Sequence, residues 1–97
     1  MIVEIQCLAF PPGPVDDKYG HIEAAIAVIE SCGLQYEVGA LGTFVEGEPD
    51  EIWPLLRRVH EACLDAGADG LVSVIKVEQS AAAVPPTIDS LTAKYRT

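Results

Sequence analysis

The chain has 97 residues, which suffices for one domain with a single two-layer core. Hydrophobic residues make up 49% and charged residues 22%, a balance typical of folded rather than disordered chains. The formal net charge of −9 repels phosphate backbones and anionic lipid, so it argues against a nucleic-acid partner and against binding to a membrane surface.

The cysteines Cys7, Cys32 and Cys63 lie far apart, each within an apolar run. Because there is no Cys-x-x-Cys pair and no Cys/His cluster, the sequence predicts neither a metal site nor a disulfide framework. Met1 leads directly into a strand-like pattern rather than a signal peptide, and no apolar run approaches the roughly 18 residues of a membrane span. We therefore expect a reduced, soluble, cytoplasmic protein without a cofactor.

The first half of the chain predicts a strand and then a helix. Ile2–Phe10 alternates with one wholly apolar face and ends at a proline-rich turn. From about Asp17 to Cys32 apolar residues recur at helical spacing, and Gly33 is placed to end the helix.

The middle of the chain predicts two short strands and a second helix. Gln35–Leu41 and Thr43–Glu46 are typical of two strands joined around Gly42, or of one long bent strand. Glu48–Glu51 has the acidic, proline-bearing composition of a helix start. Pro54 lies within the following apolar stripe, so we expect a loose or kinked first turn.

The last clear strand, Gly70–Glu78, completes a β-α-β-β-α-β order. This order predicts an α+β, ferredoxin-like fold in which two helices cover one face of a four-stranded antiparallel sheet. We expect this domain to span residues 1–79. Residues 80–97 form a linker and a tail that packs on the domain or on a neighbouring subunit, with Ile88–Tyr95 as a short helix or strand.

The sheet face away from the helices is expected to be too apolar to stand in water. It would carry Leu8, Phe10, Val72 and Val74 beside polar residues, and such a mixed face indicates packing on another subunit, with pockets at the seam. Tyr36 and Trp53 are further candidates for this interface, because aromatic residues are enriched at interfaces.

The stretch Gln35–Asp50 indicates a small-ligand pocket on the sheet. A lone hydroxyl, Thr43, and a lone carboxylate, Glu46, interrupt an apolar strand pair. The neighbouring glycines would leave room for a ligand to approach the backbone; they are Gly39, Gly42 and Gly47.

Taken together, these elements resemble the thiamine-binding protein family (YkoF-like), whose members have ferredoxin-like folds. The resemblance rests on MIVEIQCLAFPPGP, on YGHIEAAIAVIESCGLQYEVGALGTFVEGEPDEIWPLLRRVHEAC and on VSVIKVE, with the GT-x-x-EG unit (Gly42, Thr43, Glu46, Gly47) as its most specific part. It implies a homo-oligomer, a dimer or a tetramer of dimers, that binds thiamine or its pyrimidine moiety without transforming it.

The chain departs from the family pattern at both ends of its last strand. Typical members carry an arginine just before this strand and another soon after its lysine. Here these places hold Asp69-Gly70 and Glu78-Gln79-Ser80, whereas Lys76 matches the family lysine.

Six residues are candidates for ligand binding, each with a plain structural alternative. Thr43 can donate to and accept from a ligand amine or ring nitrogen, or it can simply favour a strand. Glu46 can accept from an amino group or offset a thiazolium charge, or it can stabilise the next helix. Tyr36 can stack on a ring or fill an interface. Two more candidates can line a pocket or remain exposed to solvent at a strand edge, namely Glu4 and Gln6. The sixth, Lys76, shares the last strand with Ser73 but lies on its other face, so at most one of the two points into a given pocket.

The sequence predicts no catalytic residues. His21 and His60 are expected at the surface of helices, with no Ser or Cys nucleophile placed to act with either. Two other functions remain open. One is an enzyme of the dimeric α+β barrel type, with Glu46 as its acid or base, and the other is a regulatory or assembly subunit that docks through its sheet face.

Overall fold

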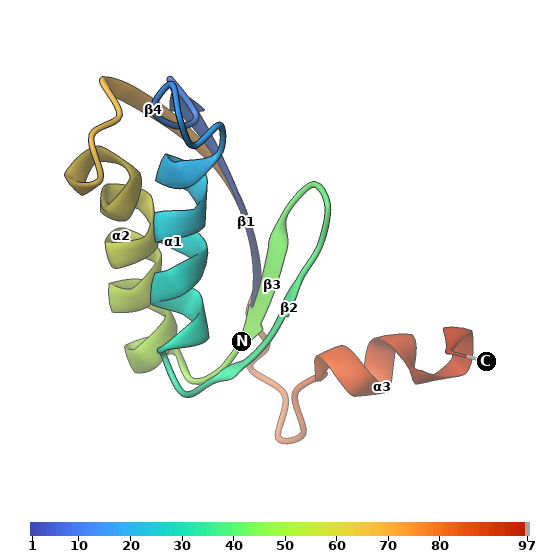
Figure 1. Ribbon diagram of the computed structural model, residues 1–97. Coiled ribbons are helices and arrows are strands. Elements are labelled where there is room, and N and C mark those ends of the chain that lie inside the picture. The colour runs from blue at the N-terminus through green and yellow to red at the C-terminus, as the bar shows by residue number, and fades with distance from the viewer. Residues whose placement is uncertain (97) are drawn as a thin grey trace.

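The structure, a computed structural model, describes residues 1–96. Four antiparallel strands form one sheet in the order β2-β3-β1-β4, and helices α1 and α2 cover one face of it (Figure 1). The strands are β1 (Ile2–Phe10), β2 (Gln35–Val38), β3 (Thr43–Glu46) and β4 (Gly70–Glu78); the helices are α1 (Gly20–Glu30), α2 (Pro49–Asp65) and the short α3 (Ile88–Thr92). The expected α+β, ferredoxin-like fold is confirmed.

Helix α2 begins more regularly than its sequence indicated. The backbone N–H of Ile52 donates to the carbonyl of Glu48 over 2.9 Å, and the Glu51 carboxylate accepts the N–H of Glu48. The expected loose first turn is therefore wrong, because this acidic cap closes the turn. Pro54 lies inside the helix, one turn further on.

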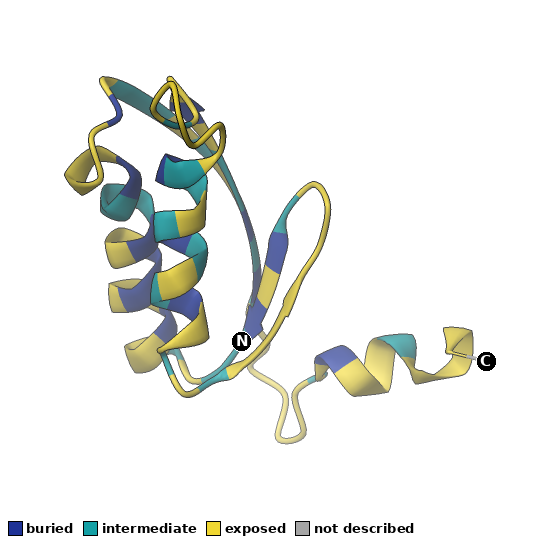
Figure 2. Ribbon diagram, in the orientation of Figure 1, coloured by how far each residue is buried: buried dark blue, intermediate teal, exposed yellow. Residues whose placement is uncertain are grey.

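The core lies between the two helices and the sheet, where the buried residues gather (Figure 2). The apolar alternation of β1 faces the helices, while α1 and α2 turn one stripe each toward the sheet. The most deeply buried large side chains are Ile29, Ile52, Leu55, Val3, Val45, Val59 and Cys63.

Strand register fixes which side chains share the opposite face of the sheet. Glu4 pairs with Phe44 on one side and with Lys76 on the other, so these three point away from the helices. We call this surface the bare face, since α1 and α2 lie on the other side. Its exposed large apolar side chains are those of Leu8, Phe10, Phe44, Val72 and Val74.

The end of the chain is helical and stands apart from the sheet (Figure 1). Of the two forms open for Ile88–Tyr95, the structure shows a helix, α3, followed by a 3₁₀ turn over Ala93–Tyr95. Thr87 caps α3, because its hydroxyl accepts the backbone N–H of Ser90 over 2.9 Å.

Candidate functional site

One hollow of the domain arises from a mismatch in strand length. β3 pairs with β1 only as far as Ile5, so β1 from Gln6 onward has no strand partner on that side. A cavity of about 220 Å³ fills this place, between β1, α1 and the loop Gly39–Gly42. We call it the edge pocket. It is lined by Ile5, Gln6, Cys7, Leu8, Ile22, Ala25, Ile26, Ile29, Gly39, Ala40, Leu41, Gly42, Thr43 and Val59.

The edge pocket reaches both sides of the sheet. Cys7 points toward the helices, whereas Gln6 and Leu8 point to the bare face, and all three line the pocket. The pocket therefore wraps around the free edge of β1. Such an edge presents backbone N–H and C=O groups that are ready to pair with another molecule.

The glycines on either side of β3 have a different role from the expected one. The Gly39 N–H donates to the Gly42 carbonyl over 2.9 Å, and a Cβ on Gly39 would lie 2.8 Å from that oxygen. A Cβ on Gly42 would lie 3.3 Å from Cγ of Glu4, and one on Gly47 would lie 3.0 Å from Cδ1 of Leu34. The chain itself fills the space, so these glycines permit close packing and tight turning rather than the approach of a ligand.

Thr43 and Gln6 are the two polar candidate residues that the structure brings to the edge pocket. Thr43 pairs with Ile5, is 5% exposed and faces the helices. Its hydroxyl can both donate and accept a hydrogen bond. Gln6 lies across the free edge of β1, at the side of the bare face.

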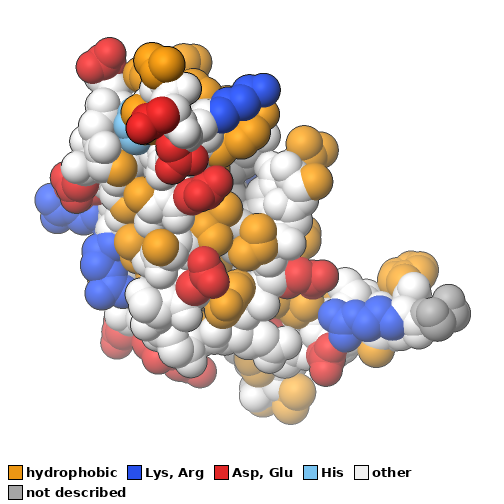
Figure 3. Space-filling view, viewed as in Figure 1, with side chains coloured by type: hydrophobic (Ala, Val, Ile, Leu, Met, Phe, Trp, Pro, Cys, Tyr) orange, Lys and Arg blue, Asp and Glu red, His pale blue; other side chains and the backbone are white. Residues whose placement is uncertain are grey.

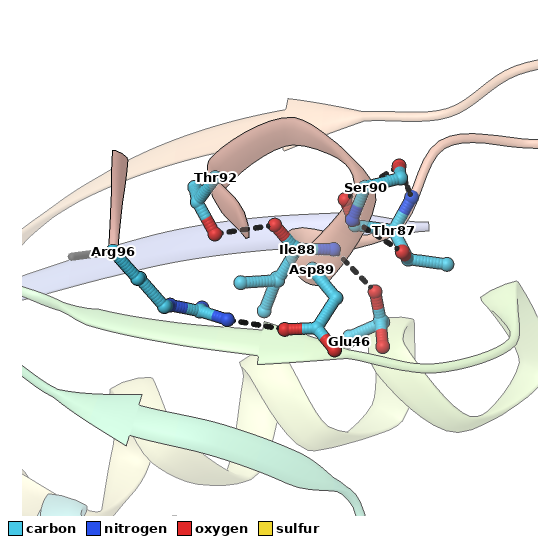
Figure 4. A network of polar contacts seen from close by, with 7 residues as sticks. All are labelled: Glu46, Thr87, Ile88, Asp89, Ser90, Thr92 and Arg96. Atoms are coloured by element: carbon cyan, nitrogen blue, oxygen red, sulfur yellow. Dashed lines mark hydrogen bonds and ion pairs between the residues drawn. The ribbon is translucent and has the colours of Figure 1, made fainter. Parts of the chain in front are cut away.

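Glu46 lies away from the edge pocket. It pairs with Ile2 on the bare face, and its Oε1 accepts the backbone N–H of Ile88 over 2.7 Å (Figure 4). The expectation that Thr43 and Glu46 face one pocket is wrong within the chain, because residues three apart in a strand point to opposite faces. In the structure Glu46 holds the start of α3.

Glu4 and Lys76 lie side by side on the bare face. Lys76 Nζ is 3.7 Å from Glu4 Oε1, and both line a shallow hollow of about 270 Å³ together with Phe44 and Glu78. Glu78 Oε1 is buried and has no hydrogen-bond partner among residues 1–96. This end of the bare face thus holds more carboxylate than the described chain neutralises.

Tyr36 lies apart from both hollows. It sits on the edge strand β2, opposite Val45, and is 38% exposed on the side of the helices. Trp53 is 52% exposed on α2. Neither aromatic side chain belongs to the bare face.

The two histidines differ from expectation. His21 is buried, with Nδ1 2.8 Å from the carbonyl oxygen of Pro11, so its expected place at the surface is wrong. His60 Nδ1 lies 2.6 Å from the Ser73 hydroxyl, which donates to Cys7 Sγ over 3.7 Å. A serine therefore does stand beside a histidine. The sequence carried no sign of this contact, because it joins α2 to β4.

Cys63 is a buried thiol at the centre of the core. It is 0% exposed, and burial raises its pKa to about 11, with a further contribution from the neighbouring Cys7. Since the thiolate is the reactive form, Cys63 is chemically inert near neutral pH.

Two features are absent from the part of the chain that the structure describes. No group of three or more His, Cys, Asp and Glu residues is arranged to hold a metal ion. None of the helices is long and apolar enough to cross a membrane.

Comparison with known proteins points to one family. Residues 5–96 match the family model of the thiamine-binding proteins. A UPF0045 protein of Clostridium perfringens is 32% identical over 78 residues, which cover 80% of each chain.

Solved structures of similar proteins share the fold. A Bacillus cereus domain of unknown function, DUF77, is 34% identical with a TM-score of 0.82, covering 99% of this chain and 91% of that one. A Thermotoga maritima protein named for thiamine biosynthesis or salvage is 28% identical with a TM-score of 0.76, covering 99% of this chain and all of that one.

Proposed function

Because the chain belongs to the thiamine-binding protein family, we propose that it binds thiamine, or a related pyrimidine or thiazolium compound, without transforming it. The observation that carries this proposal is the edge pocket, where Thr43 of the GT-x-x-EG unit lies beside the unpaired edge of β1. The protein would hold or deliver its ligand in the cytoplasm. Its three free cysteines agree with that reducing compartment.

The chemistry of the edge pocket suits an aminopyrimidine ring. Ile5, Ile22 and Ile26 offer apolar surface to the faces of a flat ring. An aminopyrimidine carries an amino donor next to ring-nitrogen acceptors, and a free strand edge offers carbonyl acceptors next to N–H donors. The Thr43 hydroxyl supplies one further donor or acceptor.

The size of the pocket favours a single ring in its interior. At about 220 Å³ it is smaller than the roughly 300–1,000 Å³ of sites that enclose drug-sized ligands. The pyrimidine would enter, and the cationic thiazolium would remain at the mouth near Gln6. Glu4 lies on the same face of β1 as Gln6, where its carboxylate can offset the positive charge.

The subunit seam is part of the same proposal. The edge pocket opens toward the bare face, whose apolar side chains are exposed in a single chain. Packing of this face on another copy, in a dimer or tetramer, would bury those side chains and place the thiazolium between subunits.

Thermal unfolding with and without ligand tests the proposed binding. A ligand that binds only the folded chain adds roughly 2.7 kcal/mol to the free energy of unfolding at a hundred times its dissociation constant. We expect thiamine and its aminopyrimidine moiety both to raise Tm, and the pyrimidine to retain part of the effect. An unchanged Tm at millimolar concentrations of both compounds would contradict the proposal.

A further inference from the structure

The chain carries a projecting segment, residues 79–96, which we call the arm. It leaves the domain at the end of β4 and stands away from the sheet (Figure 1). The radius of gyration is 14.3 Å, whereas a compact chain of 97 residues has about 12.5 Å. The extra extent indicates that the arm is not folded back onto its own domain.

The arm is too short and too apolar to be stable without a surface to pack on. Leu91 is 52% exposed and Tyr95 is 74% exposed, and among the apolar residues of α3 and its 3₁₀ turn only Ile88 is buried. Helices of fewer than about 12 residues are marginal in water unless an apolar side is covered. Its local contacts are polar and include the Thr87 cap, a bond from the Thr92 hydroxyl to the Ile88 carbonyl and an ion pair between Arg96 and Asp89 (Figure 4).

Charge separates the arm from the rest of the chain. Residues 79–97 hold two bases, Lys94 and Arg96, and one acid, so their net charge is +1. The whole chain has a net charge of −9, so residues 1–78 have a net charge of −10. The arm shows basic and apolar side chains together (Figure 3). The bare face offers the complement: exposed apolar side chains and the carboxylates of Glu4 and Glu78, which line its hollow.

We propose that the arm of each copy packs on a second copy of this chain, at the margin of its bare face. Leu91 and Tyr95 would cover apolar side chains there, while Lys94 would face its carboxylates. The base of the arm meets its own bare face at Glu46, which accepts the N–H of Ile88. From there α3 points outward, so Leu91 and Tyr95 stay exposed in the single chain. A two-fold dimer satisfies both arms at once.

This inference rests on the homo-oligomer of the proposed function but not on its ligand. Sedimentation equilibrium without thiamine tests it, on the full chain and on a Leu91→Ser/Tyr95→Ser variant. Both side chains are exposed in the single chain, so the variant should fold normally. Because the loss occurs in both copies, we expect the dimer dissociation constant to rise roughly a hundredfold.

The control replaces Val15, a fully exposed loop residue outside the arm, by serine and should leave the dissociation constant unchanged. Equal dimerisation of the double variant and the full chain would overturn the role of the arm and leave the homo-oligomer intact. A monomeric full chain would overturn both. Thiamine affinity, measured on the same samples, reports separately on the binding function.

Discussion

Replacing Thr43 by valine is expected to weaken thiamine binding about ten- to hundredfold while leaving the fold intact. Valine keeps the branched shape that suits a buried strand position, but it removes the hydroxyl of a residue that lines the edge pocket. A polar ligand atom that loses its partner in a buried site costs about 1–3 kcal/mol. Titration calorimetry gives the affinity, and urea unfolding gives the stability.

Thr43→Ser is the matched control, because it keeps the hydroxyl and loses only a methyl group. It should bind thiamine nearly as well as the natural chain. Equal affinities of the valine variant and the natural chain, with both folded, would remove Thr43 from the site.

The stability of the protein is expected to fall between pH 9 and pH 11 because of Cys63. Its pKa is about 11 in the folded chain, against 9.0 for an ordinary thiol. Over this window the folded state retains a proton that the unfolded state has lost, so rising pH favours unfolding. The contribution of the protonated Cys63 thiol to the free energy of unfolding is fully present below pH 9. Roughly 2 kcal/mol of this contribution is lost by pH 11.

Urea unfolding at a series of pH values, on the natural chain and on Cys63→Ala, isolates this effect. The smaller side chain lowers the free energy of unfolding of the variant by the same amount at every pH. Lysines and tyrosines titrate in both proteins, so their effect cancels in the comparison. Parallel pH profiles of the two proteins would show that burial of this thiol does not shift its titration.

The fold was readable from the sequence because its signals are local. The alternation in Ile2–Phe10 and the helical spacing behind Asp17 each identify one element, and their order identifies the topology. The regular start of α2 was not expected, because Pro54 favours a loose turn, whereas the Glu51 carboxylate closes it. The choice between helix and strand for Ile88–Tyr95 could not be made, because its apolar pattern is short.

The candidate site was predicted in part. Thr43 and Gln6 do meet at a pocket, but the edge pocket exists because β3 is shorter than β1, which only the strand pairing reveals. The separation of Thr43 from Glu46 follows from their spacing along one strand and could have been deduced from it. The contact of His60 with Ser73 depends on how α2 lies over β4, which no local pattern encodes.

The central claim is that the edge pocket binds the pyrimidine ring of thiamine, and amide chemical shifts test it most directly. Thiamine would be titrated into ¹⁵N-labelled protein. We expect the largest shift changes at Gln6–Leu8 and Gly39–Thr43, which line the pocket, and small ones along the outer face of α2. Saturable changes confined to other parts of the chain, or none at millimolar thiamine, would contradict the claim.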